Sequence, residues 1–370
     1  MSADAGDATV AHALVLREAA VLEEVELPLP ALGEDDGLLR VEAAGICGTD
    51  VQQYRGRLGG VPSVVPVVPG HEIVGRIERA GESALRRWGV AVGDRVLLEE
   101  VLRCGECGAC AQGARGCERM RVYGLTVPVH EPPGLWGGYS THVYLAPTVD
   151  LHRVPDGLEP QVAVLAMPVA NGLRWAGTLP GTGPGSTVVV LGPGQQGLGC
   201  VVGALVAGAK TVIVVGRAAD RRRFDMASQL GAHHTIDADA VDPVAAVREL
   251  TGGRGADVAV DATAEAVGAV VQAIDMCATG GTVVLAGLKG FAPIPGFVSD
   301  VVVLKGLHIL GAGGHDKESV DAALRLLASG RFPLERMATH FLPLAQAEHA
   351  LRIVAREVPG EEPIHVSLRP

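Results

Sequence analysis

With 370 residues, 48% of them hydrophobic and 20% charged, the chain can bury a large core and is not a disordered segment. Its net charge of −11 argues against nucleic acid or an anionic membrane as the main partner. Residues 1–16 have no basic stretch before an apolar one, so no secretory signal is predicted, and the region 198–215 is too broken by glycine to be a membrane span. Seven cysteines, an odd number, favour a reducing cytoplasm over a disulfide framework.

The length predicts about two domains, and the residue pattern changes near Pro155. Residues from about 8 to 155 are expected to be β-rich, with short alternating runs at 12–16, 38–43, 73–80 and 95–98. After Pro155, strands predicted at 187–191, 211–215, 234–237, 257–261 and 282–286 alternate with helices predicted at 196–207, 220–230, 243–250 and 266–277. This alternation predicts an α/β fold with a doubly wound parallel sheet that is covered on both faces.

The last part of the chain is expected to serve both domains. Residues 301–310 are predicted to form a final strand at the edge of the parallel sheet, and residues 317–329 a helix. A short β-rich tail follows, and we expect it to pack back on the N-terminal domain. We therefore predict a catalytic domain of residues 1–158, completed by residues 312–370, and a nucleotide-binding domain of residues 159–311.

Four cysteines lie close together in the run CGECGACAQGARGC, namely Cys104, Cys107, Cys110 and Cys117. Four thiolates on a turn-rich segment can surround one tetrahedral zinc ion without any other ligand. Such a site leaves no open position for a substrate, so the zinc predicted here is structural. The alternative is a reduced, metal-free loop.

A glycine-rich loop directly follows the predicted strand TVVVL and opens a helix. It contains Gly192, Gly194, Gln195, Gln196 and Gly197. In this strand–loop–helix context the spacing G-x-G-x-x-G is typical of a dinucleotide-binding site, because the glycines allow a tight turn and the helix N-terminus attracts a pyrophosphate. The alternative is an ordinary glycine turn in a glycine-rich protein.

The end of the second predicted strand bears on which coenzyme is bound. NAD-binding proteins usually carry an acidic residue there, but this strand ends in Gly216 and Arg217, with Arg221 and Arg222 following. A guanidinium pairs well with a 2′-phosphate, so we expect NADP(H) to be preferred over NAD(H). The alternative is that these arginines only form a solvated helix start.

A second candidate metal site combines a thiol from GICGTD with an imidazole and a carboxylate from PGHE. These are Cys47, His71 and Glu72, which are good zinc ligands and leave one coordination position open. A zinc ion there is expected to polarise a carbonyl and stabilise an alkoxide, as hydride transfer with a nicotinamide requires. We expect Asp50 to orient the imidazole and Thr49 to pass a proton. Each residue alone has an ordinary structural explanation, and only the combination favours a metal.

Taken together, the runs GICGTD, PGHEIVG and GGYS, the cysteine lobe and the GPGQQG loop make the chain resemble the zinc-dependent alcohol dehydrogenases of the medium-chain dehydrogenase/reductase family. The resemblance spans nearly the whole chain. It implies a GroES-like catalytic domain, a Rossmann coenzyme domain, a cleft between them and a homodimer or homotetramer. It also places Cys47, His71 and Glu72 at catalytic-zinc positions, Thr49 at the proton relay and Asp50 behind the imidazole.

Three features depart from that family. The usual ligand near the start of the coenzyme domain is replaced by Met167, a poor zinc ligand, so the expected set is Cys47, His71, Glu72 and water, as in the polyol dehydrogenase branch. The expected relay histidine is Gln52, which cannot titrate. The last gap of the cysteine lobe has six residues, where the family more often has seven.

The leading hypothesis is a zinc-dependent oxidoreductase that interconverts a secondary alcohol or polyol and its carbonyl with NADP(H) or NAD(H). A second hypothesis is a reductase of the same fold that reduces an activated C=C or C=N bond without catalytic zinc, which Met167 and Gln52 would suit. A third is a coenzyme-binding protein without turnover. The small-molecule substrate itself is not readable from the sequence, since fold does not fix function.

A few further residues are candidates for the substrate pocket or for assembly. Trp136 and Tyr139 are interpreted either as apolar pocket walls or as loop anchors, and Glu100 falls near a substrate-lining position of the family. The predicted edge strand at 301–310 could extend the sheet across a two-fold axis.

Overall fold

The structure is a computed structural model that describes residues 9–58, 63–112 and 117–370. Two compact units are present, one made of residues 1–164 and 338–370 and the other of residues 165–337. Among the described helices, none combines the length and apolar character needed to cross a membrane. Residues 1–8 of the segment examined for a secretory signal, and residues 113–116 of the gap between Cys110 and Cys117, lie outside the described residues.

The first unit is mainly β-structure with short helices. Its strands are β1 (Val10–Glu18), β2 (Val21–Pro28), β3 (Gly37–Ile46), β4 (Glu72–Ala80), β5 (Arg95–Leu98), β6 (Val101–Leu102), β7 (Arg121–Val122), β8 (His142–Leu145), β9 (Leu151–Arg153), β16 (Ala338–Pro343) and β17 (His365–Arg369). Its helices are α1 (Gly48–Tyr54), α2 (Glu82–Trp88), α3 (Gly108–Ala111), α4 (Pro160–Ala163), the 3₁₀ turn η4 (Leu344–Gln346) and α12 (Ala347–Val354).

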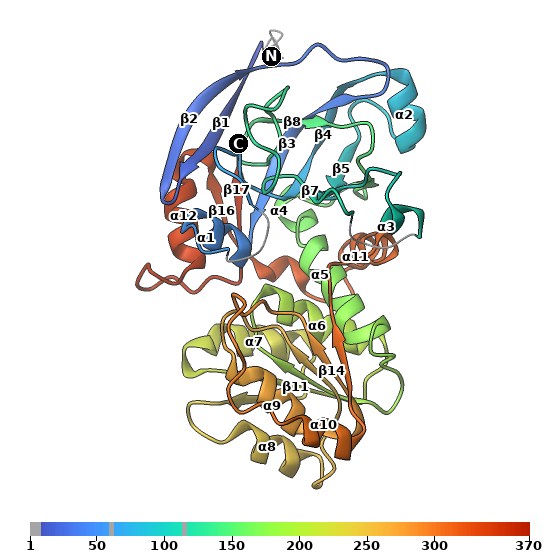
Figure 1. The fold of residues 1–370 in the computed structure, drawn as a ribbon, viewed down its shortest axis with the longest axis vertical. Helices are drawn as coiled ribbons and strands as arrows, with labels where there is room; N and C mark the ends of the chain where they lie inside the picture. Colours follow the sequence, from blue (N-terminus) through green and yellow to red (C-terminus); the bar gives the residue numbers. More distant parts are fainter. Residues whose placement is uncertain (1–8, 59–62, 113–116) are drawn as a thin grey trace. The chain divides into compact units, whose positions relative to one another are not determined.

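The central sheet of this unit joins distant parts of the chain. Its strand order is β16-β17-β3-β4-β5-β9, with β8 also paired to β3. The tail strand β17 runs antiparallel to β3, with Val366 opposite Ile46, and the two lie side by side in Figure 1. Because β3 is almost wholly buried and aromatic residues are few, Val, Leu, Ile and Ala fill most of the core.

The second unit alternates strands and helices. Its strands are β10 (Thr187–Leu191), β11 (Thr211–Gly216), β12 (His234–Asp237), β13 (Ala256–Asp261), β14 (Cys277–Leu285) and β15 (His308–Gly311). Its helices are α5 (Ala166–Gly172), the π-helical turn η1 (Leu173–Thr178), α6 (Gln195–Val206), the 3₁₀ turn η2 (Ala218–Asp220), α7 (Arg221–Leu230), α8 (Pro243–Leu250), α9 (Gly268–Met276), α10 (Ser299–Lys305), α11 (Lys317–Ser329) and the 3₁₀ turn η3 (Leu334–Met337).

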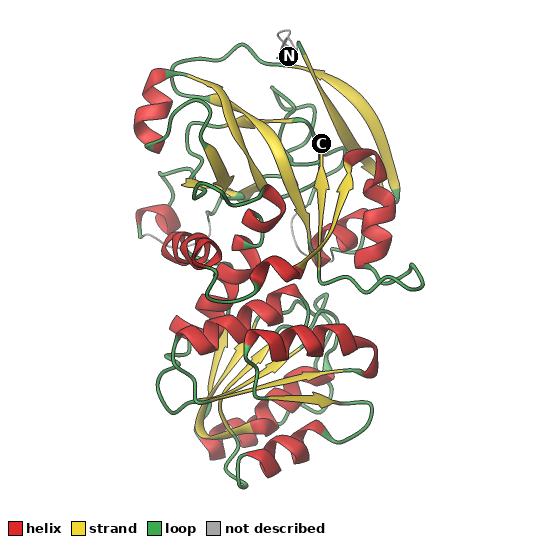
Figure 2. Ribbon diagram, turned by 180° about the vertical axis from the view of Figure 1, so that it is seen from behind, coloured by secondary structure: helices red, strands yellow, loops and turns green. Residues whose placement is uncertain are grey.

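All six strands of the second unit run parallel, in the order β12-β11-β10-β13-β14-β15. Helices lie on both faces of this sheet (Figure 2), and one apolar core joins alternate strand residues to α8 and α9. This is the Rossmann arrangement, in which the strand order reverses at β10 and ligands bind beyond the carboxyl ends of the strands. The predicted doubly wound parallel sheet is confirmed.

The main error of the sequence analysis concerns residues 301–310. Only His308–Gly311 forms the edge strand β15, whereas residues 301–305 belong to helix α10. An apolar run such as VVVL has no periodicity that separates a strand from a helix, so tertiary contacts decide. The ammonium of Lys305 donates hydrogen bonds to three carbonyl groups at the end of α9, and Gly306 ends α10 in the left-handed conformation.

Two smaller differences concern the tail and the helix before it. The tail contains a helix, α12, besides its two strands. Helix α11, which we expected to belong with the tail, lies in the second unit, where Asp316 at its start pairs with Arg174 at 3.3 Å.

Candidate functional site

The four clustered cysteines of the first unit form a compact thiol group. Their sulfur atoms all lie within 4.8 Å of one another. Cys107 caps helix α3 and its sulfur accepts the backbone N–H of Cys110 at 3.4 Å, while the sulfur of Cys104 accepts the N–H of Cys107 at 3.3 Å. The turn and the short helix therefore aim the side chains at one point, as the close spacing predicted.

Neighbouring groups prepare these thiols for a cation. The backbone N–H groups of Cys110 and Glu118 lower the pKa of Cys107 to about 6, so one thiolate is already present at neutral pH. Although the N–H of Gly105 opposes it, the neighbouring thiols raise the pKa of Cys110 to about 11. Four thiolates cannot ionise side by side without a positive ion, and a tetrahedral zinc with four sulfur ligands fits this donor set.

A second group in the same unit consists of Cys47, His71 and Glu72. Their ligand atoms also lie within 4.8 Å of one another, and all three residues are buried. Cys47 is the N-cap of α1, and its sulfur lies 3.3 Å from Nε2 of His71. His71 immediately precedes β4, and Glu72 is the first residue of that strand. The structure thus brings together the three residues that the sequence predicted as open-site ligands.

Asp50 holds this group from behind. One carboxylate oxygen accepts the backbone N–H of Cys47 at 2.8 Å, and the other lies 3.5 Å from Nδ1 of His71. Although burial opposes it, Asp50 and Cys47 raise the pKa of the His71 ring well above its ordinary value. Burial raises the pKa of the Cys47 thiol. Asp50 therefore lies where an orienting partner of His71 would stand, although Oδ1 of Asp50 and Nδ1 of His71 have no hydrogen-bond partner among the described residues.

Glu72 reaches the group because the residue opposite it on the neighbouring strand is a glycine, which has no side chain. Gly45 of β3 is its partner across the ladder, and a Cβ atom on Gly45 would lie only 2.4 Å from Oε2 of Glu72. Oε2 is buried without a hydrogen-bond partner among the described residues, and the ring of His365 lies 3.8 Å away. His365 in β17 was missed by the sequence analysis, because a lone histidine in a tail strand carries no signal.

These observations fit an open metal site. Thiolate, imidazole and carboxylate are the ligands that zinc prefers, and the orphaned oxygen of Glu72 is a buried anion that a cation would satisfy. No fourth Cys, His, Asp or Glu in the described part of the first unit joins this group. One coordination position would therefore remain free. Met167, which stands where the family usually has a further ligand, is buried in α5 of the second unit.

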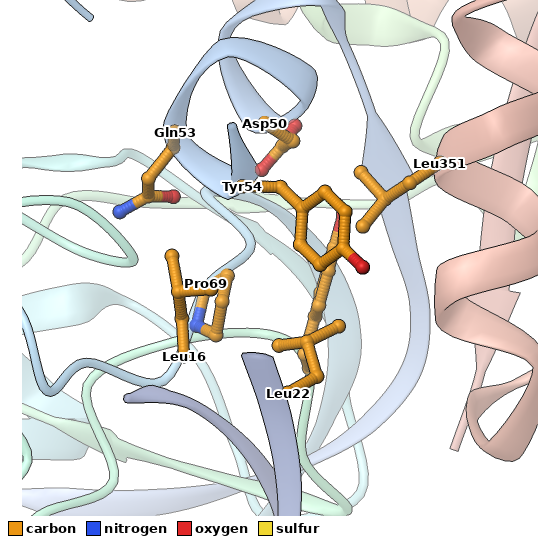
Figure 3. Close-up of a pocket in the computed structure, with 8 residues that line it drawn as sticks. Leu16, Leu22, Asp50, Gln53, Tyr54, Pro69 and Leu351 are labelled. Carbon is orange, nitrogen blue, oxygen red and sulfur yellow. The ribbon is translucent and has the colours of Figure 1, made fainter. Parts of the chain in front are cut away.

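A small cavity adjoins Asp50 and is lined mainly by apolar side chains (Figure 3). Its volume of about 10 Å³ matches one water molecule, so it is not a substrate pocket. Asp50, Gln53 and Tyr54 reach it from α1 and Leu351 from α12. Tyr139 also lines it and is fully buried, and burial together with the nearby Asp50 raises the pKa of its phenol far above the ordinary value.

The remaining predicted residues of the first unit lie either on helix α1 near the thiol or in loops of that unit. Thr49 is half-buried at the start of α1, two positions after Cys47, and its backbone N–H donates to the Cys47 sulfur at 3.3 Å; Gln52 follows on the same helix. Trp136 is a buried anchor, since its indole N–H donates to the carbonyl of Glu131 at 2.9 Å and its ring packs against two tyrosines. Glu100 is half-buried just after β5.

The glycine-rich loop of the second unit connects β10 to α6. Gly192 has φ of 91°, a conformation that favours glycine, and a Cβ atom on Gly197 would lie 1.9 Å from the carbonyl oxygen of Gly192. At Gly194, by contrast, a Cβ atom would meet nothing within 4 Å. Gln195 and Gln196 begin the helix and no side chain caps it, so the N–H groups of its first turn are available to a ligand. The loop is thus a cradle that suits a pyrophosphate.

The end of β11 carries the residues that were predicted to select between NAD(H) and NADP(H). A Cβ atom on Gly216 would lie 2.8 Å from Pro193 of the loop, so this strand end borders the cradle. Arg217 is exposed, and its Nε donates to Asp239 at 3.0 Å. Arg221 is exposed at the start of α7. The sequence analysis missed Asp239, because it lies in the loop after the third strand and not at the end of the second.

A buried ion pair lies at the carboxyl end of β13. Nζ of Lys289 lies 2.9 Å from Oδ2 of Asp261, and it also donates to the hydroxyl and the carbonyl of Thr263. The same hydroxyl donates to Asp261 at 2.6 Å. Because a Cβ atom on Gly192 would touch Thr263, this network supports one wall of the cradle. The sequence analysis missed Lys289, since a single lysine in a loop gives no sign of burial.

Comparisons with known proteins agree with this geometry. Residues 33–156 match the alcohol dehydrogenase GroES-like domain, and residues 197–329 match the zinc-binding dehydrogenase domain. A probable alcohol dehydrogenase of Mycobacterium tuberculosis is 46% identical over 98% of this chain and all of the relative. The erythritol/L-threitol dehydrogenase of Mycolicibacterium smegmatis is 34% identical over 94% of each chain.

Solved structures lead to the same group of proteins. A protein of Sinorhizobium meliloti assigned as a zinc-binding dehydrogenase, with NADP bound, superposes with a TM-score of 0.83 and 28% identity over 98% of this chain and 100% of that one. The resemblance seen in the sequence motifs is therefore confirmed. The chain belongs to the zinc-binding, NAD(P)-dependent alcohol dehydrogenases of the medium-chain dehydrogenase/reductase family.

Proposed function

We propose that the protein interconverts a secondary alcohol or a polyol and its carbonyl, with a zinc ion held by Cys47, His71 and Glu72. The observation that carries this proposal is the buried group of three potential ligands, whose ligand atoms lie within 4.8 Å of one another. The name of the Mycolicibacterium smegmatis relative, which acts on four-carbon polyols, supports the substrate class. When bound, the zinc would supply Lewis acidity that polarises the substrate oxygen.

The chain's own residues would orient the ligands and move the substrate proton. Asp50 holds His71 in the orientation that ligation needs, through its contact with Nδ1. Thr49 is the candidate to accept the hydroxyl proton of the substrate, because it is half-buried next to Cys47. Gln52 cannot carry that proton further, so the relay would continue through the coenzyme ribose or water.

The coenzyme is a nicotinamide dinucleotide, and we propose a preference for NADP(H). The support is the absence of a carboxylate from the end of β11 and the exposed guanidinium of Arg217 in that place. The candidate contacts are the cradle and its flank, formed by Gly192, Gly194, Gln195, Gln196, Gly197, Gly216, Arg217 and Arg221. Comparable Michaelis constants for the two coenzymes would refute the preference.

We propose that the cysteine lobe holds a second, structural zinc. The experiment that tests both sites is elemental analysis of protein purified without a chelator or a metal-affinity tag. The wild-type protein should contain two zinc ions per chain. Glu72→Gln should lose the open-site zinc and keep the lobe zinc, whereas Cys107→Ser should lose the lobe zinc.

The outcome also decides between two reactions. One zinc per wild-type chain, absent in Cys107→Ser but unchanged in Glu72→Gln, would refute catalytic zinc. It would favour the alternative, a reductase of an activated C=C or C=N bond, which the neutral residues Met167 and Gln52 would suit. Full zinc and full activity in Glu72→Gln would exclude that residue from the ligand set.

We further propose that the chain acts as a homodimer or homotetramer in a reducing compartment such as the cytoplasm. All seven cysteines are free thiols. Exposed apolar side chains gather on the segment from Leu288 to Ile309, and Val303 and Leu304 are 76% and 83% exposed. Light scattering of Leu304→Glu, which should dissociate the assembly, tests this surface against the wild-type protein.

A further inference from the structure

The loop after β12 places a carboxylate against Arg217. Oδ1 and Oδ2 of Asp239 lie 3.0 and 3.3 Å from Nε of Arg217. Within the described part of the chain only Nε of this guanidinium has a partner, and the side chain is 77% exposed, so its terminal nitrogens are available to form a fork with a phosphate. The pair therefore combines a phosphate-binding cation with an anion that is next to the same space.

Asp239 is held in this place from two further directions. Its Oδ2 accepts the backbone N–H of Ala218 at 3.1 Å, and its own N–H donates to Oδ1 of Asp237 at 2.9 Å. The N–H of Ala218, and after it the guanidinium of Arg217, lower the pKa of the Asp239 carboxyl. The carboxylate cannot swing away from Arg217 without losing the Ala218 hydrogen bond.

The pair lies beside the phosphate cradle. Strands β11 and β12 are neighbours, with Gly216 opposite Asp237, and Gly216 packs against Pro193 of the glycine-rich loop. A coenzyme with its pyrophosphate on that loop extends its adenosine ribose toward the end of the second strand in this fold. Asp239, in the loop after the third strand, then lies beside the place where NAD-binding proteins carry an acidic residue at the end of the second strand.

We propose that Asp239 is a specificity-determining residue that opposes Arg217: its carboxylate accepts a hydrogen bond from the ribose 2′-hydroxyl of NAD(H) and repels the 2′-phosphate of NADP(H). The proposal rests on the coenzyme preference proposed above and explains how that preference is limited. The 2′-phosphate carries nearly two negative charges, and a carboxylate about 5–8 Å from it in water changes binding by about five- to twentyfold. Arg217 alone would give strong discrimination, and the pair gives a moderate one.

The test measures binding of 2′,5′-ADP and 5′-AMP by calorimetry, which needs no turnover. Asp239→Asn keeps an acceptor for the Ala218 N–H and removes the charge. It should bind 2′,5′-ADP about five- to twentyfold more tightly and 5′-AMP no more tightly than the wild type. Asp225→Asn, which removes an exposed charge on α7, is the matched control and should change neither affinity by more than about twofold.

The two proposals fail in different ways. Arg217→Gln should weaken 2′,5′-ADP binding at least tenfold and leave 5′-AMP binding nearly unchanged. If it does so while Asp239→Asn brings no gain, or a loss, the role of Asp239 is refuted and the phosphate site stands. If Arg217→Gln has no effect on either nucleotide, or neither nucleotide binds the wild-type protein, the coenzyme proposal fails and the role of Asp239 fails with it.

Discussion

Lys289→Met is expected to destabilise the second unit strongly, although methionine keeps most of the apolar stem of lysine. The side chains of Lys289 and Asp261 are only 10% and 1% exposed, so the change leaves a buried carboxylate without its cation. Removing one partner of such a pair costs about 3–5 kcal/mol. The hydrogen bonds from Thr263 to the carboxylate remain, so the lost terms are the ion pair and the two Nζ contacts with Thr263.

The assay should report on this unit alone, because a chain with two units need not unfold in one step. Hydrogen–deuterium exchange of a peptide that covers β13 does so. A loss of about 3–5 kcal/mol corresponds to exchange about 150- to 5000-fold faster where opening is rapid and reversible. Lys210→Met is the matched control, because Lys210 is an exposed lysine of the same unit.

The double variant Asp261→Asn/Lys289→Met separates charge from packing. With both charges gone, no uncompensated ion is buried and most of the protection should return. The asparagine oxygen can still accept the two hydrogen bonds from Thr263. Exchange in Lys289→Met within tenfold of the control, or a double variant as fast as the single one, would refute the reasoning.

Four other substitutions test the sites and one surface ion pair of the second unit. Gly194→Ala should leave the melting temperature unchanged but weaken NADP(H) binding at least tenfold, because its methyl group fills the open cradle, whereas Gly197→Ala should lower the melting temperature, since its methyl would lie 1.9 Å from a backbone oxygen. Gly45→Ala should lower the zinc content from two toward one per chain, because its methyl would displace Glu72; a variant that keeps both ions contradicts this. The guanidinium of Arg254 lowers the pKa of the Asp257 carboxyl below 3.8 in the folded protein, so the unfolded chain binds more protons at low pH. The stabilisation of the folded state by this pair is therefore complete above pH 3.8 and is lost as the pH falls through the folded-state pKa. Urea unfolding should therefore give a lower free energy of unfolding for Asp257→Asn than for the wild type at pH 7, and this difference should become smaller toward pH 3.

Local patterns were enough to predict most of the parallel sheet. The strand Thr187–Leu191 and the helix Pro243–Leu250 have the bounds that were predicted, because continuous buried valines and a capped amphipathic run are local signals. Helix α10 was not predictable in this way. Residues 301–305 are held as a helix by the hydrogen bonds that Lys305 donates to three carbonyl groups at the end of α9, and these acceptors are brought together only in the folded unit.

In the candidate sites, too, local motifs were predictable and contacts made only by folding were not. Cys47 and His71 stand in short motifs whose residue types and order indicate a metal, and the structure brings them within 3.3 Å. His365, Asp239 and Lys289 carry no such signal, since each acts through a neighbour that the fold supplies from another strand or loop. Sequence reasoning therefore identified the candidate ligands and the loop, and missed the polar and charged side chains that surround them.

The pairing of β17 with β3 has a consequence for synthesis of the protein. Residues that face each other there, Val366 and Ile46, are about 320 positions apart in the chain. A ribosome that adds about 5–20 residues per second needs about 16 seconds or more to make that stretch. The contiguous second unit can fold during this interval, whereas β3 cannot pair with β17 until the end of the chain has been made. Chaperone dependence during expression should therefore concern the first unit, and pulse proteolysis of stalled nascent chains would detect it there.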